Sequence, residues 1–305
     1  MTGPQAPTRP GATAGGVAAL AVWSTSVAVV RSVSASLGTL TAGALAMGAG
    51  GLVALALAWA RGRPPKAMLA LPRKYLLVCG GLFVGYEVCI YGALGWAAND
   101  SIALLAGLAN YLWPVLTVVL AVPILHRRAR WWMALGCLVA VAGISAAVLD
   151  HPQFQWGQLR QAGPSAIGPL ALAVAGALLW GLYCNLVRRC GQPEMGAVPL
   201  FLLGAAATLG LMRLLHTETT TWSARSAAEL CFIAVAQSAL AYALWEYGMR
   251  GGNHLLLGLL SYFLPIAATA VAATYLRVVP GGGLIVGCVL VTAGALICKS
   301  ALAER

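Results

Sequence analysis

Apolar runs of about 20 residues follow one another along almost the whole chain, and short polar segments separate them. A helix of this length crosses a hydrocarbon core of about 30 Å. Lipid offers the backbone no hydrogen-bond partners, so a spanning segment must be a helix or a strand of a closed barrel. The alternating pattern of barrel strands is missing here. The sequence therefore predicts an all-α membrane protein.

Ten such runs can be placed along the sequence, with ends defined to within a few residues. We expect transmembrane helices at residues 14–33, 38–60, 75–97, 102–125, 131–149, 166–187, 196–215, 228–249, 254–276 and 281–299. Residues 1–13, rich in Pro, Gly and Ala, are expected to form a flexible tail.

The composition excludes a soluble protein and argues against nucleic-acid binding. Of the 305 residues, 60% are hydrophobic and only 9% are charged, whereas a soluble domain carries about 25% charged residues. The net charge of +11 comes from residues in the loops between apolar runs, and basic stripes with interleaved aromatic residues are absent. The basic excess therefore reports membrane orientation.

The loop charges predict which way the chain crosses the membrane. If the N-terminus is cytoplasmic, the cytoplasmic segments hold 14 of the 19 Lys and Arg residues. The opposite side keeps Arg31, Arg160, Arg213, Arg225 and Arg277. The positive-inside rule then places both termini in the cytoplasm. We expect a multi-pass protein of a bacterial inner membrane.

Neither a metal nor another cofactor is predicted. The eight cysteines lie in or beside apolar runs without a Cys-x-x-Cys pair, as expected of small core residues, and the four histidines have no ligand partner at metal spacing. The sequence also lacks His-Glu-x-x-His and Gly-x-Ser-x-Gly, which argues against a membrane enzyme.

The two halves of the chain share residues at nearly constant offsets. At an offset of 151, Gly107, Tyr111, Pro114, Gly136, Cys137, Ala142 and Gly143 match Gly258, Tyr262, Pro265, Gly287, Cys288, Ala293 and Gly294. At 156, Tyr86 matches Tyr242, and at 157, Trp23 matches Trp180. Each half, residues 14–150 and 166–300, holds five expected helices. An odd number makes the second half enter the membrane from the other side, so we predict two inverted five-helix repeats, an arrangement typical of transporters with a midplane site.

Polar and aromatic residues surround the prolines of the fourth and ninth expected helices. Asn110, Tyr111 and Trp113 precede Pro114, and Ser261 and Tyr262 precede Pro265. Proline frees a backbone carbonyl, which is tolerated at membrane depth where protein or water satisfies it. A polar cavity beside both prolines would do so. The alternative is helix packing, with Asn and Ser as interhelical hydrogen-bonding groups and Gly107 and Gly258 allowing close approach.

Glu87 lies near the middle of the third expected helix, where a charged acid costs about 3 kcal/mol. It shares a helix face with Phe83 and Tyr91. Its carboxyl group could hold a substrate ammonium, carry a proton, or be a neutral acid hydrogen-bonded to a neighbouring helix. The sequence leaves these three roles open.

The repeat, the Gly-x6-Pro of the fourth and ninth helices, and the Gly-rich fifth and tenth helices resemble the EamA-type exporters of the drug/metabolite transporter superfamily, over nearly the whole chain. Tyr111 and Trp113 before Pro114, with Trp180, are similar to the aromatic amino-acid exporters of that group. The resemblance implies a ten-helix basket whose central cavity is lined by aromatic residues at positions such as Tyr86. An acid that usually ends the fourth helix is replaced here by His126, Arg127 and Arg128, so no coupling role transfers to this end.

The sequence therefore favours a secondary transporter that exports amino acids, including aromatic or large apolar ones, by alternating access. Export of other metabolites or lipophilic drugs is the main alternative, and a membrane enzyme is a distant one. The expected partners are the small-molecule substrate and the bilayer. Proton coupling, exchange and facilitated diffusion are all compatible with the sequence, as is a monomer. The candidate substrate-binding residues are Tyr86, Glu87, Tyr91, Asn110, Tyr111, Trp113, Trp180, Ser261 and Tyr262, and the candidate hinges are Gly107, Pro114, Gly258 and Pro265.

Overall fold

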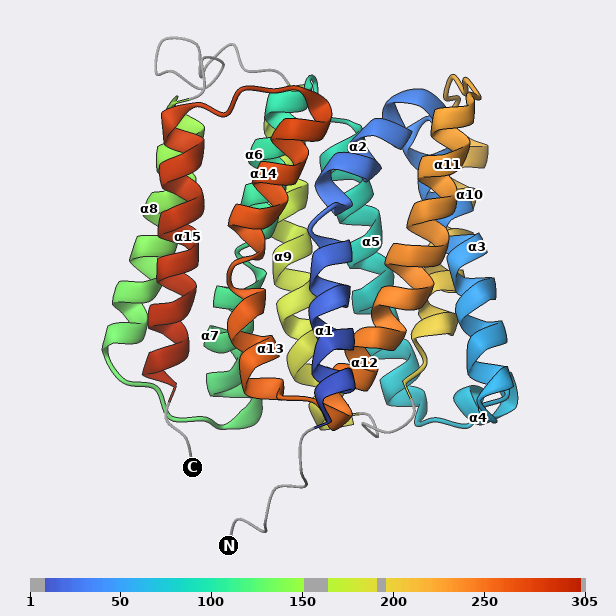
Figure 1. Cartoon of the computed structure of the whole chain (residues 1–305), viewed down its shortest axis with the longest axis horizontal. Coiled ribbons are helices and arrows are strands. Elements are labelled where there is room, and N and C mark those ends of the chain that lie inside the picture. The colour runs from blue at the N-terminus through green and yellow to red at the C-terminus, as the bar shows by residue number, and fades with distance from the viewer. Residues whose placement is uncertain (1–8, 151–163, 191–195, 303–305) are drawn as a thin grey trace, which may run out of the picture.

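The computed structural model describes residues 9–150, 164–190 and 196–302, and within them the only regular secondary structure is helical. The helices run side by side along one axis of the molecule (Figure 1). The first half contains α1 (Pro10–Trp23), α2 (Ser26–Leu37), α3 (Thr39–Ala60), α4 (Pro65–Leu69), the π-helical η1 (Tyr75–Cys79), α5 (Gly80–Gly95), α6 (Asp100–Asn110), α7 (Trp113–Leu125) and α8 (Trp132–Asp150). The second half contains α9 (Pro164–Cys190), α10 (Val198–Leu215), α11 (Ala224–Phe232), the π-helical η4 (Ile233–Leu240), α12 (Ala241–Gly251), α13 (His254–Ser261), α14 (Leu264–Leu276) and α15 (Gly282–Ala301).

Eight helical segments of the described chain, three of which combine two or three of these elements, are long and apolar enough to cross a membrane. The pair α1 and α2, bent by 41° at a short break, would make a ninth span, and α14 is a shorter apolar helix. A multi-pass membrane protein is therefore confirmed in outline, while the number of ten spans stays a prediction.

Three of the expected helices are interrupted, which corrects the sequence-based assignment. The first begins at Pro10, four residues earlier than expected, and breaks at Ser24 and Thr25. The fourth breaks at Tyr111 and Leu112, and the ninth at Tyr262 and Phe263. In the last two cases a proline is the second residue of the new helix, a position where its missing N–H has no intrahelical partner to lose.

The long helices of the two halves make equivalent contacts: the pattern is the same when each helix is replaced by its counterpart in the other half. α1 packs against α12, and its counterpart α9 packs against α5, the counterpart of α12. α3 packs against α10 and α8 against α15, so each of these pairs joins counterpart helices (Figure 1). The counterparts α8 and α15 run in opposite directions.

The turns after α7 and α14 also match. His126 and Arg277 are the only non-glycine residues of the described chain with positive φ, at 51° and 57°. Each ends its helix in the left-handed conformation, a common helix C-cap. Their separation of 151 residues equals the sequence offset of these helices.

Four glycines bring α8 and α15 into direct backbone contact. A Cβ atom built on Gly136 would lie 2.8 Å from the carbonyl oxygen of Gly294, and one built on Gly294 would lie 2.6 Å from that of Gly136. Gly143 and Gly287 face each other in the same way, at 2.9 and 2.7 Å. Small residues at such crossings allow the close packing that joins helices in lipid.

The two ends of the bundle differ in charge. We call the end where α1 begins and α15 ends the proximal face, and the opposite end the distal face (Figure 1). The segments at the proximal face, including α4 and the turn between α7 and α8, carry most of the basic residues. Asp100, Asp150, Glu218 and Glu229 lie on segments at the distal face.

The glycine crossing predicts a stability difference between two alanine variants. Gly143→Ala should lower the apparent melting temperature by several degrees, because its methyl group meets the backbone of α15. Gly81→Ala is the matched control, since a Cβ there has nothing within 4 Å, and alanine is favoured over glycine by about 1 kcal/mol in a helix. The measurement is thermal unfolding in detergent followed by size-exclusion chromatography. Equal behaviour of the two variants would contradict close packing of α8 on α15.

Candidate functional site

A cavity of about 570 Å³ lies between the two halves, and its volume suits a small-molecule ligand. Residues of α1, α2, α3, α5, α9, η4 and α12 line most of it. It reaches the proximal face at Arg61, Arg63 and Gly196. Its deep end lies at Val30 and Leu94, close to the distal face. The cavity is therefore open at one end of the bundle.

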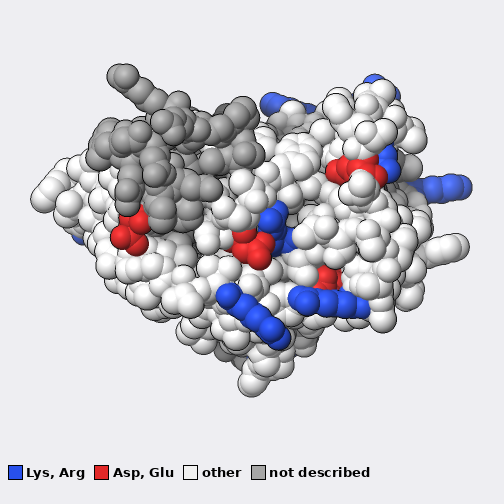
Figure 2. All heavy atoms as spheres, turned by 90° about the horizontal axis from the view of Figure 1, so that it is seen from above, with Lys and Arg blue, Asp and Glu red and all other residues white. Residues whose placement is uncertain are grey.

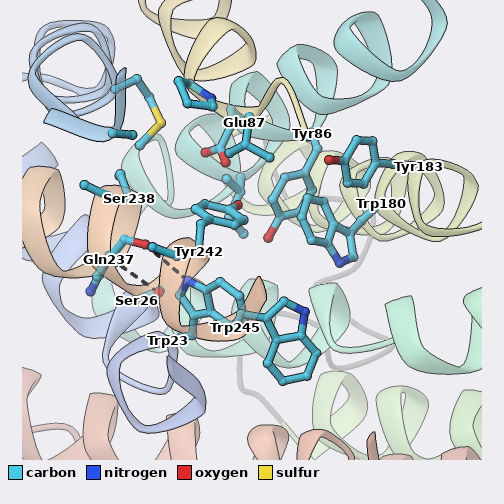
Figure 3. Close-up of a pocket in the computed structure, with 18 of the residues that line it drawn as sticks. Trp23, Ser26, Tyr86, Glu87, Trp180, Tyr183, Gln237, Ser238, Tyr242 and Trp245 are labelled. Carbon is cyan, nitrogen blue, oxygen red and sulfur yellow. Dashed lines mark hydrogen bonds between the residues drawn. The ribbon is translucent and has the colours of Figure 1, made fainter. Parts of the chain in front are cut away.

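The first aromatic group in the cavity joins α5 to α9. Tyr86 lies 4.7 Å from Trp180 between ring centroids, and Trp180 stacks on Tyr183 at 5.0 Å. Phe83 packs behind Trp180 and Tyr183. Figure 3 shows Tyr86, Trp180 and Tyr183 together on one side of the cavity.

The second aromatic group joins α1 to α12. Trp23 lies 5.1 Å from Tyr242 and 5.6 Å from Trp245, again between ring centroids (Figure 3). By the repeat offsets, Trp23 corresponds to Trp180 and Tyr242 to Tyr86. Each Trp–Tyr pair therefore takes one ring from each half, and the two pairs are related by the repeat.

Glu87 projects into the cavity between these groups (Figure 3). Glu87 is buried, with only 6% of its surface exposed. No hydrogen bond or ion pair joins it to any residue that the structure describes. The neutral acid bonded to a neighbouring helix, one of the three roles considered for Glu87, thus has no partner among the described residues. An unpaired buried carboxyl group is costly, so a partner from the cavity would be strongly favoured.

Eight of the nine predicted binding residues line the cavity. These are Tyr86, Glu87, Tyr91, Asn110, Tyr111, Trp113, Trp180 and Ser261. The side-chain oxygen of Asn110 is buried without a hydrogen-bond partner in the described chain, whereas the Ser261 hydroxyl donates to the carbonyl oxygen of Gly258 at 2.7 Å.

Tyr262 is the exception, since it does not line the cavity. It packs instead with Val115, Val118 and Met133, beside α8. α13 ends at Ser261, and Tyr262 is the first residue of the break.

The four predicted hinge residues lie at or near the two proline breaks, outside the cavity lining. Pro114 and Pro265 open α7 and α14. A Cβ on Gly107 would meet the Val27 side chain at 2.8 Å, so this glycine does permit close packing. Gly258 has nothing within 4 Å of such an atom, which leaves it without that packing role.

Several lining residues were not singled out as binding residues from the sequence. Trp23, Tyr183, Gln237, Tyr242 and Trp245 all line the cavity. The offsets that match Tyr86 with Tyr242 and Trp180 with Trp23 would have identified two of them. Gln237 has no such signal, because the position 156 residues earlier is Gly81.

Arg31 joins helices beside the distal end of the cavity. Its guanidinium is 2.8 Å from Asp100 and donates to the carbonyl oxygens of Leu94, Gly95 and Ala97 at 2.9 to 3.2 Å. These contacts tie α2 to the end of α5 and the start of α6. A partly buried charged network of this kind is far stronger than an isolated surface ion pair.

Glu229 joins a second set of helices near the distal face. One of its carboxylate oxygens accepts hydrogen bonds from Ser32 at 2.8 Å, Arg225 at 2.7 Å and Tyr275 at 2.6 Å. This joins α2, α11 and α14. Figure 2 shows the distal face, where acidic and basic side chains lie next to one another.

Comparison with known proteins agrees with this architecture. The EamA-like transporter family matches residues 11–149 and 168–299. The protein named aromatic amino acid exporter YddG from Salmonella typhimurium is 30% identical over 95% of this chain and 97% of its own length. Its namesakes from Escherichia coli and Ancylobacter novellus are each 29% identical, over 95% and 97% of this chain and 97% and 99% of their own.

A solved structure titled only as the crystal structure of a protein has the same fold. It aligns with a TM-score of 0.69 and 26% identity, covering 96% of this chain and 98% of its own. The family match covers both halves of the chain. The chain therefore belongs to the EamA-like transporter family, and is a transporter rather than an enzyme.

Proposed function

We propose that this chain is a secondary transporter that exports amino acids, with aromatic and large apolar side chains among its substrates. The observation that carries the proposal is Glu87, a buried acid without a partner in the described chain, in a cavity walled by two Trp–Tyr pairs. The printed names of three relatives over nearly the full length support the same substrate class.

The chemistry of the cavity fits an amino acid better than a neutral drug. A substrate ammonium would pair with the Glu87 carboxylate and remove the cost of leaving that charge unpaired. The Trp and Tyr rings offer apolar area and cation–π attraction, worth about 0.5 to 2 kcal/mol each. A purely lipophilic compound would satisfy the aromatic walls but leave Glu87 without a partner.

The matched halves of the sequence and the difference between the two ends of the cavity support alternating access. The family matches the chain in two segments, and counterpart helices run in opposite directions, which supports ten spans in two inverted halves. The cavity is open at the proximal face, while the Arg31 and Glu229 networks close the distal face. In the proposed cycle, substrate binding favours a second state in which these networks separate and the proximal end closes.

The charge distribution supports the orientation needed for export. Most basic residues lie at the proximal face, and the positive-inside rule makes that face cytoplasmic. The state described here is then open to the cytoplasm, where the substrate of an exporter is loaded.

The aromatic walls predict a selective transport defect. Trp180→Ala should lower phenylalanine uptake into proteoliposomes about three- to thirtyfold while affecting alanine much less, because only the larger side chain reaches the ring. Trp59→Ala is the control, since Trp59 is 67% exposed on α3 and lies outside the cavity. Equal losses for both substrates, or in both variants, would mark Trp180 as a packing residue.

The orientation predicts the reactivity of two introduced thiols in a cysteine-free background. In intact cells, Thr219→Cys at the distal face should react with a membrane-impermeant maleimide. Arg128→Cys, exposed between α7 and α8, should react only after the inner membrane is opened. The reverse labelling pattern would show the opposite membrane orientation, with the open end of the cavity facing outward.

The distal networks predict how the closed end opens. Arg31→Gln should make a cysteine at Val30, at the deep end of the cavity, react several-fold faster with the same reagent from outside. Arg277→Gln serves as the control, because Arg277 is exposed at the same face and no hydrogen bond of its side chain to a described residue is found. An unchanged rate at Val30 would show that the Arg31 contacts do not hold the distal end shut.

A further inference from the structure

The first helix is interrupted halfway across the bundle. α1 has 14 residues and α2 has 12, so the break at Ser24 and Thr25 lies near the middle of the span. The two hydroxyl groups donate to the carbonyl oxygens of Ala21 and Val22, both at 2.7 Å. α2 therefore starts at membrane depth, and Ser26 and Val27 of its first turn line the cavity. The N-terminal end of a helix favours negative charge.

Gln237 lies against this break from the π-helical η4. Its amide nitrogen donates to the Thr25 hydroxyl at 2.8 Å, and its amide oxygen accepts from the Ser26 hydroxyl at 3.4 Å. Its backbone oxygen accepts from the Trp23 ring nitrogen at 3.2 Å. These bonds fix the amide in one orientation. π-helical turns inside membrane helices occur frequently at functional sites.

Gln237 and Ser238 form a polar wall of the cavity, and both have hydrogen-bond donors without a partner in the described chain. A primary amide carries two N–H groups, and only one of those on Gln237 has a partner among the described residues. The hydroxyl of Ser238, a residue only 3% exposed, also lines the cavity, and the described chain provides it with no hydrogen-bond partner. In Figure 3, Gln237 and Ser238 lie across the cavity from Tyr86 and Trp180, with Glu87 and Tyr242 between.

This polar wall breaks the symmetry of the cavity. The repeat gives the Trp–Tyr pairs counterparts, but the position equivalent to Glu87 is Ala243 and the one equivalent to Gln237 is Gly81. The acid therefore stands on one half and the neutral donors on the other. Among the described lining residues, the only Lys or Arg residues are Arg61 and Arg63, at the proximal mouth.

We propose that Gln237, together with Ser238 and the N-terminal end of α2, binds the α-carboxylate of the substrate, while Glu87 binds its α-ammonium. The inference rests on the proposed transport of amino acids and specifies how they are held. Neutral donors and a helix start bind a carboxylate without a lysine or arginine, which limits affinity and allows release. The two groups orient the substrate, and its side chain meets the Trp–Tyr pairs.

Three ligands separate the two contacts in competition with labelled phenylalanine uptake into proteoliposomes. Phenylalanine has both charged groups, phenethylamine keeps the ammonium alone, and 3-phenylpropionate keeps the carboxylate alone. Gln237→Leu should weaken inhibition by phenylalanine and 3-phenylpropionate about tenfold and leave inhibition by phenethylamine unchanged. Glu87→Gln should weaken inhibition by phenylalanine and phenethylamine and leave that by 3-phenylpropionate unchanged.

Two further variants keep the test independent of folding. Ser238→Ala removes a cavity hydroxyl without touching the bonds between Gln237 and the helix break, and should weaken phenylalanine inhibition about two- to fivefold. Thr208→Val is the matched control, because the Thr208 hydroxyl donates to Gly204 within α10, outside the cavity. All variants are compared at equal amounts of protein that elutes as a monodisperse peak in size-exclusion chromatography.

The outcomes separate this inference from the proposed function. If Gln237→Leu and Ser238→Ala weaken phenethylamine as much as phenylalanine, or leave phenylalanine unchanged, the carboxylate assignment is overturned while amino-acid transport stands. If the unmodified protein takes up no amino acid, the proposed function fails, and the assignment fails with it.

Discussion

Every polar group at membrane depth must be satisfied by protein or by water, and this constraint determines where the present structure can be irregular. The three interrupted helices all break beside the cavity or at its rim. At the first break, the Ser24 and Thr25 hydroxyls donate to the preceding turn, and Gln237 donates to the Thr25 hydroxyl. Irregular backbone therefore lies where the cavity is.

The same constraint sorts the buried charges into two classes. Arg31 and one carboxylate oxygen of Glu229, near the distal face, each have several protein partners, as expected of charges that hold helices together. Glu87 has none among the described residues and faces the cavity. Arg31 and Glu229 stabilise the packing of the helices in this state. Glu87 is instead available to a ligand that binds and dissociates.

Hydropathy, the repeat and the family resemblance together predicted the helices and part of the cavity lining. The helices follow from segment length, and the nine predicted binding residues, eight of which line the cavity, came from the proline-containing helices, Glu87 and the family resemblance. The first break was not predicted, since Ser24 and Thr25 have no Gly or Pro beside them and the interruption depends on hydroxyl bonds to the backbone and on Gln237, which is distant in sequence. Tyr262, predicted as a binding residue, packs outside the cavity lining, and Gln237 was missed because it has no counterpart in the other half.

Symmetry and asymmetry carry different parts of the proposed mechanism. The glycine crossing of α8 and α15 and the two Trp–Tyr pairs are nearly unchanged when the halves are exchanged. In the proposed cycle, this gives the inward-open and outward-open states similar contacts, so that a few kcal/mol from a bound substrate can shift their populations. A site with that symmetry alone would hold a zwitterion equally well in two orientations. Glu87 on one half and Gln237 on the other remove this degeneracy, because exchanging the ends of the substrate would place its carboxylate against an acid.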